Sequence, residues 1–204
     1  MTTPKVKICG LRRADDIAAA NMLKPDYVGF VFAAGSRRRV SPEEALAMKR
    51  LLDPQIKAVG VFVGEPVEEI SGICRSGAID IVQLHGGEND ERRLATLRAA
   101  VPGVPVIRAF KVCAASDLAA AAASATDMVL LDAGAGEGRA FDWSMLAERP
   151  LGRPYFLAGG LGPDNVAEAV RLLHPFAVDA SSSLETGGFK DFAKMEKFIL
   201  EARQ

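Results

Sequence analysis

The sequence alternates short apolar runs with stretches of helical composition, and this alternation restricts the possible folds more than any other feature. Runs rich in Val, Ile and Phe, separated by helices at a spacing of roughly 25 residues, predict parallel strands joined by right-handed crossovers. Eight runs fit the pattern, at 5–9, 27–32, 58–63, 79–85, 104–110, 128–132, 155–159 and 176–182. Eight units close a barrel, so we expect an α/β fold of the (β/α)₈ (TIM) barrel type. A doubly wound open sheet, with fewer or less regular units, is the alternative.

Helix signals between the runs support this interpretation. Ser41 stands at an N-cap position, Pro42 at the first helical position and Glu44 three residues after the cap, which is a capping-box pattern. Another helix is expected from Pro163, and the alanine-rich segment 114–125 is expected to form an ordinary helix rather than a linker. No domain boundary is visible, and we therefore expect residues 1–204 to form a single barrel domain.

The composition restricts the classes of partner. Lys and Arg together number 25 and Asp and Glu 26 in a chain of 204 residues, so no broad basic field is available to hold nucleic acid or an anionic membrane surface. No signal-peptide pattern and no run of about 18 apolar residues is present, which predicts a cytoplasmic protein. Cys9, Cys74 and Cys113 are odd in number and far apart, which argues against a disulfide framework and against a zinc site.

In a barrel of this kind the chemistry lies at the C-terminal ends of the strands. Cys9 ends the first run, and its thiol is expected to point into the barrel mouth. The ordinary alternative is that a free cysteine is a small buried hydrophobe. That structural role is assigned to Cys74, inside a predicted helix, and to Cys113, beyond the end of the fifth run.

Alternation along the first run places Lys5, Lys7 and Cys9 on one face of the strand. A lysine in a barrel interior is costly unless it has a partner. Asp179 lies on the eighth run, which is next to the first in a closed barrel. We therefore expect an ion pair between Lys7 and Asp179 below the site, with Lys7 also favouring the thiolate form of Cys9.

Asp132 ends the sixth apolar run and opens a glycine-rich stretch, DAGAGEGRAF. A carboxyl group at a mouth with apolar walls is a candidate general acid, and an aspartate that caps a turn is the ordinary alternative. The glycines do not lead into a clear helix start, as a nucleotide-binding fingerprint requires. A loop over the site is therefore the expected structure.

Small and basic residues at other strand ends suit an anionic ligand. Gly159-Gly160 and the serines at 181–183 lie where barrels bind a phosphate through backbone N–H groups and a short helix, although such residues also make ordinary tight turns. One of the three arginines at 37–39 could clamp a carboxylate, whereas a basic run is usually solvated surface. His85 has an equally favourable position, but a lone histidine is more often a hydrogen-bonded structural group.

Taken in order, these motifs resemble phosphoribosylanthranilate isomerase of tryptophan biosynthesis over nearly the whole chain. They are KICGL (7–11), GFVF (29–32), SRRRVSPEEA (36–45), VGVFV (59–63), VQLHG (82–86), LLD (130–132), FDW (141–143), LAGGLGPDNV (157–166) and FAVDASS (176–182). The resemblance implies an aldose–ketose isomerase that performs an Amadori rearrangement of N-(5-phosphoribosyl)anthranilate without a metal or redox cofactor. By this resemblance, Cys9 is the general base, Asp132 is the general acid and Arg38 meets the anthranilate carboxylate.

The resemblance also implies that the substrate phosphate lies on the loops at Gly160 and at Ser182-Ser183, and we expect His85, Gly159 and Asp179 to be further substrate-binding residues. Three features depart from the family pattern. The loop after Asp132 is shorter than usual and has Arg139 in place of a lysine, Ser183 replaces a glycine, and Arg37 replaces a proline or lysine.

Two other functions are weighed against this one. The isomerase of histidine biosynthesis performs the same rearrangement on a different aminoaldose, but has an aspartate where this chain has Cys9. A non-catalytic phosphosugar-binding barrel is conceivable from the altered loops, but Cys9 and Asp132 are both retained. The expected partner is a small phosphosugar, and the expected oligomeric state is a monomer or a homodimer.

Overall fold

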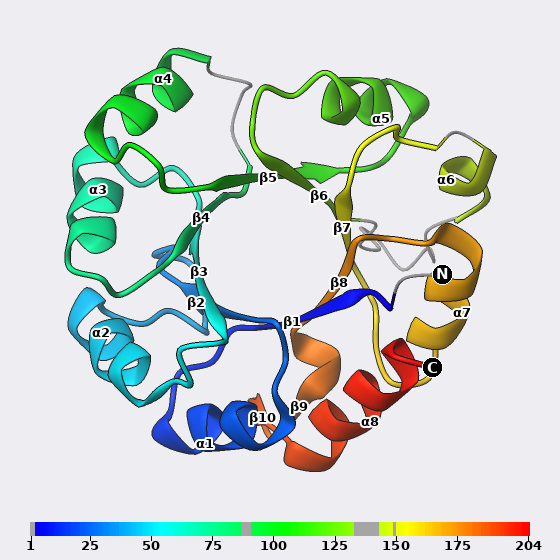
Figure 1. Ribbon diagram of the computed structural model, residues 1–204, viewed down its shortest axis with the longest axis horizontal. Coiled ribbons are helices and arrows are strands. Elements are labelled where there is room, and N and C mark those ends of the chain that lie inside the picture. Colours follow the sequence, from blue (N-terminus) through cyan, green and yellow to red (C-terminus); the bar gives the residue numbers. More distant parts are fainter. Residues whose placement is uncertain (1–2, 87–90, 133–142, 149) are drawn as a thin grey trace.

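A computed structural model describes residues 3–86, 91–132, 143–148 and 150–204, and these form a closed barrel of eight parallel strands with helices around it (Figure 1). The strands are β1 (Lys5–Cys9), β2 (Tyr27–Val31), β3 (Lys57–Phe62), β4 (Ile81–Leu84), β5 (Val106–Lys111), β6 (Met128–Asp132), β7 (Tyr155–Ala158) and β8 (Ala177–Ala180). Because β1 pairs with β8 as well as with β2, the sheet has no free edge. The barrel prediction is confirmed, and the open-sheet alternative is wrong.

The surrounding helices are α1 (Ala14–Leu23), α2 (Pro42–Leu51), α3 (Val67–Arg75), α4 (Glu91–Ala100), α5 (Ala115–Ala122), α6 (Ser144–Glu148), α7 (Val166–Leu173) and α8 (Phe192–Ala202). The start of α2 is as predicted, since the Ser41 hydroxyl accepts from the Glu44 amide and the Glu44 carboxylate accepts from the Ser41 amide. Helix α7 begins later than Pro163. The Asn165 side chain bonds back to Gly162 N and Gly160 O and holds the intervening residues in a turn.

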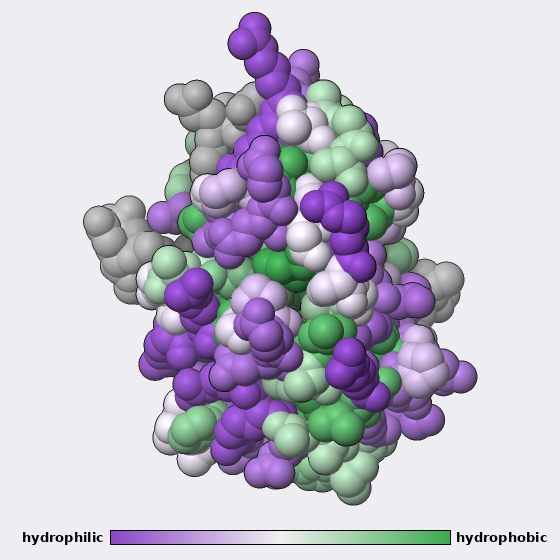
Figure 2. Space-filling view, turned by 90° about the vertical axis from the view of Figure 1, so that its left-hand side faces the viewer, coloured by the Kyte–Doolittle hydropathy of each residue, from purple (hydrophilic) through white to green (hydrophobic). Residues whose placement is uncertain are grey.

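The core has two layers, which follow from the alternation of side chains along each strand. Outward residues such as Val6 and Phe30 pack under the helices, whereas inward residues such as Tyr27, Ile107 and Phe156 fill the barrel. On the side of the ring that carries α2, α3 and α4, hydrophilic residues cover most of the outer surface, with smaller hydrophobic areas between them (Figure 2). By the same alternation, Lys5 and Lys7 lie on the inward face of β1 together with Cys9.

An additional unit lies between β8 and α8, and the sequence analysis expected a short helix there but not the hairpin that follows it. It consists of a short 3₁₀ helix, η2 (Ser182–Leu184), and an antiparallel hairpin of β9 (Glu185–Thr186) and β10 (Phe189–Lys190). Figure 1 shows this hairpin beside α8. Because β8 ends at the barrel mouth, the unit places the side chains of β9 and β10 next to the residues that follow β1 and β2.

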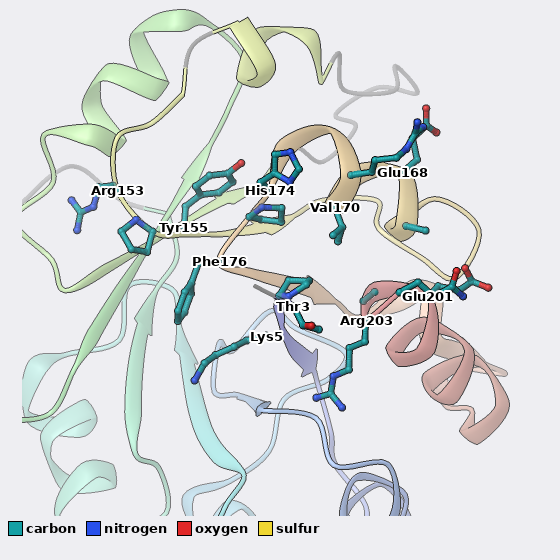
Figure 3. A pocket seen from close by; sticks show the side chains of 17 residues that line it. Thr3, Lys5, Arg153, Tyr155, Glu168, Val170, His174, Phe176, Glu201 and Arg203 are labelled. Atoms are coloured by element: carbon teal, nitrogen blue, oxygen red, sulfur yellow. The ribbon is translucent and has the colours of Figure 1, made fainter. Parts of the chain in front are cut away.

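The opposite end of the barrel contains a cavity of 1040 Å³. It lies by the N-terminal ends of β1 and β7 and beside α7 and α8, and its walls include Lys5, Tyr155, His174, Phe176 and Arg203 (Figure 3). None of the strand-end residues singled out from the sequence lines it. Among the described helices, none is both long enough and apolar enough to cross a membrane.

Candidate active site

Cys9 ends β1 with its side chain in the barrel mouth, as expected. It is 9% exposed and forms a small apolar cluster with Val31, Ala33 and Val61 from the ends of the two following strands. Gly29 on β2 pairs with Cys9, and a methyl group at position 29 would lie 2.7 Å from the Cys9 Sγ. The thiol therefore occupies space that only a glycine on the neighbouring strand leaves open.

Below Cys9, Lys7 and Asp179 form the predicted ion pair. The two residues lie opposite each other on β1 and β8, and Lys7 Nζ lies 2.9 Å from Asp179 Oδ2. The Lys7 side chain is completely buried. Burial lowers the pKa of Lys7, but Asp179 and Cys9 raise it by more, so the ammonium form is maintained. Lys7 thus places a positive charge under the thiol, which the negative charge of Asp179 partly offsets.

The expected effect of Lys7 on Cys9 is confirmed in its direction, but burial outweighs it. Burial raises the pKa of the Cys9 thiol, whereas the positive charges of Lys7 and Lys190 lower it and the negative charge of Asp179 raises it. Burial prevails, and the pKa lies above the ordinary thiol value. Lys7 acts in the predicted direction, but it reduces the cost of a buried thiolate without making the thiolate the favoured form.

Asp132 and His85 meet on the other side of the mouth. Asp132 ends β6, His85 directly follows β4, and His85 Nε2 lies 3.8 Å from Asp132 Oδ2. Both side chains are partly exposed to the mouth, His85 by 40% and Asp132 by 29%. The interpretation of His85 as a lone histidine is wrong, because Asp132 is within ion-pair distance. A carboxyl group and an imidazole are thereby placed together opposite the thiol.

Arg38 lies in the loop after β2 and reaches the mouth. Its Nε and Nη2 donate to Glu185 Oε1 and Oε2 at 2.6 and 2.9 Å, which is a bidentate ion pair. Lys190 Nζ donates to the same Glu185 carboxylate at 2.8 Å and to Ser181 O at 3.0 Å. Glu185 and Lys190 were missed from the sequence, since both lie beyond the last predicted strand in a segment without periodicity.

Gln83 is a second residue that the sequence analysis missed. It lies on β4, two residues before His85, and is 3% exposed in the barrel interior. Its Oε1 accepts no hydrogen bond from any residue the structure describes, and the same holds for Asp179 Oδ1. The sequence did contain a signal for Gln83, since it is a polar residue in the apolar run IVQL and lies two positions from His85, on the same face of the strand. These two buried acceptors are suited to donors on a ligand.

The residues expected to bind phosphate lie on two adjacent loops. Gly159 and Gly160 follow β7 with φ of 89° and 73°, and Ser182 begins η2 after β8. The Ser183 hydroxyl donates to Leu161 O and so joins the two loops. Ser183 is not among the described residues with a positive φ, so a serine fits here without the left-handed conformation that favours glycine.

The stretch after Asp132 falls at 133–142, outside the described residues, and this includes Arg139 and the first two residues of the FDW motif. The described part of the mouth brings together a thiol, a buried lysine, a carboxyl–imidazole pair and an arginine, with two small-residue loops beside them. Such a set can remove a proton from carbon, deliver one to oxygen and hold an anionic substrate.

Comparison with known proteins gives a consistent match. The family model described as N-(5'phosphoribosyl)anthranilate (PRA) isomerase matches residues 6–201. The N-(5'-phosphoribosyl)anthranilate isomerase of Endomicrobium trichonymphae is 44% identical over 197 residues, which cover 94% of each chain. That of Lacticaseibacillus casei strain BL23 is 45% identical over 98% of this chain and 94% of the relative.

Solved structures agree. The phosphoribosyl anthranilate isomerase of Thermotoga maritima is 36% identical with a TM-score of 0.88, and the match covers 98% of each chain. A phosphoribosyl anthranilate isomerase in complex with reduced 1-(o-carboxyphenylamino)-1-deoxyribulose 5-phosphate is also 36% identical, with a TM-score of 0.86 and the same coverage. A thiamine phosphate pyrophosphorylase from Pyrococcus furiosus, 11% identical with a TM-score of 0.71, shares the fold.

Proposed function

The chain belongs to the N-(5'-phosphoribosyl)anthranilate isomerase family, and from that premise we propose that it rearranges N-(5-phosphoribosyl)anthranilate with Cys9 as general base and Asp132 as general acid. The product is 1-(2-carboxyphenylamino)-1-deoxyribulose 5-phosphate, an intermediate of tryptophan biosynthesis. The observation that carries the assignment of roles is the position of Cys9 and Asp132 at the ends of β1 and β6, on opposite sides of one mouth.

The first step opens the furanose ring of the substrate. Asp132 delivers a proton to the ring oxygen, the bond between that oxygen and C1 breaks, and the nitrogen lone pair forms a Schiff base with C1. A carboxyl group suits this role because it can hold a proton and release it within hydrogen-bond distance. His85, 3.8 Å from Asp132 Oδ2, supports the orientation of the carboxyl group.

The second step removes the C2 hydrogen. The protonated Schiff base makes this hydrogen acidic, and the thiolate of Cys9 takes it to give an enolamine, which tautomerises to the ketone. The charges of Lys7 and Lys190 favour the thiolate, and Gly29 leaves room for the sulfur. The cycle balances because C1 of the enolamine takes up a proton, which Cys9 returns, and the C2 hydroxyl gives up its proton, which restores the Asp132 carboxyl group.

The protein binds the substrate at its two anionic ends, the carboxylate and the phosphate. We assign the anthranilate carboxylate to Arg38 and the phosphate to the backbone of Gly159, Gly160 and Ser182-Ser183. Asp179, whose Oδ1 has no donor among the described residues, is suited to a sugar hydroxyl. The complex of the relative with reduced 1-(o-carboxyphenylamino)-1-deoxyribulose 5-phosphate supports a small phosphosugar ligand.

The alternatives are less well supported. The family match and the names of the relatives favour the anthranilate substrate over the aminoaldose of histidine biosynthesis. A non-catalytic barrel would not require a thiol, a buried lysine and an imidazole–carboxyl pair at one mouth. A dimeric relative from Thermotoga maritima is compatible with either a monomer or a homodimer here, and a cytoplasmic location stays a prediction.

The test follows the loss of fluorescence of phosphoribosylanthranilate, generated in situ, in the presence of the purified protein. Wild type should be active, and Cys9→Ser and Asp132→Asn should each lose about 10²-fold or more in kcat, as expected for a positioned acid or base. Cys74→Ser, which changes a thiol in α3 away from the mouth, is the matched control. Inactivity of the wild type would overturn the function, and an active Asp132→Asn would overturn only the acid assignment.

A further inference from the structure

The buried carboxylate of Glu185 in β9 lies at the centre of a cluster of three basic side chains beside the mouth. Its side chain is 5% exposed. Oε1 accepts from Arg38 Nε and from Lys190 Nζ, and Oε2 accepts from Arg38 Nη2 and, at 3.2 Å, from Arg37 Nη2. Burial raises the pKa of the Glu185 carboxyl, but the hydrogen bonds and charges of Arg38 and Lys190 outweigh it and lower the pKa to about 2. The carboxylate is therefore charged throughout the neutral range.

The hairpin that carries Glu185 is tied to the loop after Cys9. The Arg12 and Arg13 guanidinium groups lie 4.4 and 4.1 Å from the centre of the Phe189 ring. Arg12 Nη2 also donates to Gly188 O at 2.6 Å. These contacts connect the hairpin to the loop between β1 and α1, so Glu185 has a defined position relative to Cys9.

Arg38 reaches Glu185 across the residue that follows Cys9. A methyl group at Gly10 would lie 2.5 Å from Arg38 Cδ, which shows how closely the arginine stem covers this backbone. Glu185 takes the donors on one edge of the guanidinium, Nε and Nη2. Arg38 Nη1 has no acceptor among the residues the structure describes. The guanidinium carries five N–H groups in a rigid fork, so the edge formed by Nη1 and Nη2 keeps two donors for a second carboxylate.

We propose that Glu185 is a positioning residue, which fixes the Arg38 guanidinium so that its Nη1–Nη2 edge binds the carboxylate of the substrate and makes the site selective for carboxylated aminosugars. This inference rests on the proposed function. Arginine without such a partner would distribute its donors over several rotamers, and a carboxylate ligand would have to order it on binding.

Glu185→Gln is the variant that tests the role with little change of shape. Each carboxylate oxygen of Glu185 accepts two hydrogen bonds, so an amide nitrogen would face two donors in either orientation of the glutamine. The Arg38 guanidinium group would then no longer be held in one orientation. Glu196→Gln, the same substitution at an exposed position of α8, is the matched control.

The measurement is a ratio of two dissociation constants for each variant. The ligands are reduced 1-(o-carboxyphenylamino)-1-deoxyribulose 5-phosphate and its counterpart that lacks the carboxyl group. Wild type should prefer the carboxylated ligand by about 10- to 100-fold, the range for a hydrogen-bonded charged group. Glu185→Gln should reduce this preference by about tenfold and leave the affinity for the other ligand unchanged, and Glu196→Gln should match wild type.

A double variant tests whether Glu185 acts on the ligand preference through Arg38. Arg38→Ala should abolish the preference, and adding Glu185→Gln to it should change the ratio no further, because the two residues act as one unit. If Glu185→Gln does not fold, Glu185→Asp, which keeps the charge beside Lys190, should show the same loss of preference.

Three outcomes would overturn the inference. They are a wild-type preference in Glu185→Gln, an equal loss of affinity for both ligands, and additive effects in the double variant. A wild type that does not convert phosphoribosylanthranilate would instead refute the proposed function.

Discussion

Lys7 and Asp179 are 172 positions apart in the sequence, and their side chains meet at 2.9 Å inside the barrel, directly below Cys9. Strands β1 and β8 close the sheet in a register that sets these two residues opposite each other. The pairing of β1 with β8 that closes the barrel therefore also places the Lys7 ammonium group below the thiol. One strand pairing thus contributes both to the closure of the fold and to the charges beneath Cys9.

Removing both partners of this pair should cost less stability than the sum of removing each one alone. Lys7→Met leaves a buried carboxylate without its partner and should lower the free energy of unfolding by about 3 to 5 kcal/mol. The double variant Lys7→Met/Asp179→Leu should lose less than the sum of the two single variants, since no unpaired charge remains. Urea denaturation of the four proteins measures both effects. Strict additivity would show that the pair is not coupled.

The pH dependence of kcat/KM should reflect the raised pKa of Cys9. A general base acts in its deprotonated form, so the rate should rise with pH, and a pKa above the ordinary thiol value of about 8.5 places this rise at higher pH than a solvated cysteine would. Lys7→Met removes a positive charge that lowers the pKa and should move the rise to still higher pH. Cys74→Ser should leave the profile unchanged. A rise below the ordinary thiol value would contradict the prediction.

Gly29→Ala should disturb Cys9 from the neighbouring strand. The added methyl group would lie 2.7 Å from Cys9 Sγ and 3.1 Å from Cys9 Cα, so one strand must shift. We expect a destabilisation of about 1 to 3 kcal/mol and a loss of kcat of about tenfold or more. Gly72→Ala in α3 is the control, because a methyl group there meets nothing within 4 Å, and the helix should gain about 0.5 to 1 kcal/mol. Equal behaviour of the two variants in thermal unfolding and turnover would refute the steric reasoning.

His85→Asn should lower kcat by less than Asp132→Asn does. The imidazole lies 3.8 Å from the Asp132 carboxylate and supports its orientation, whereas the proton is delivered by Asp132 itself. We expect a loss of about 3- to 10-fold, and the variant His85→Asn/Asp132→Asn should be no slower than Asp132→Asn alone. A double-mutant cycle on kcat measures this coupling. A further drop in the double variant would mean that His85 has a separate role.

Much of the barrel could be predicted because its signals are local. Each run of apolar residues specifies a strand, and the period of two specifies which side chains share a face, so Lys7 and Cys9 could be placed inside before the fold was known. The capping box at Ser41 specified the start of α2 in the same way. The strand ends differ from the predicted ones by no more than two residues, since hydrogen bonding to the neighbouring strands decides them.

The sequence by itself determined the fold class, the mouth at which Cys9, His85 and Asp132 lie, and the partner of Lys7, because periodicity, strand order and closure leave few other arrangements. Only the tertiary structure decided that Glu185 and Lys190 reach Arg38, that Asp132 pairs with His85, and that burial outweighs Lys7 at the thiol of Cys9. Arg38 and Glu185 are 147 residues apart, and Glu185 lies in a hairpin with no periodic pattern. Contacts between loops, and the balance between burial and charge, depend on distances in space that a repeating pattern along the chain does not encode.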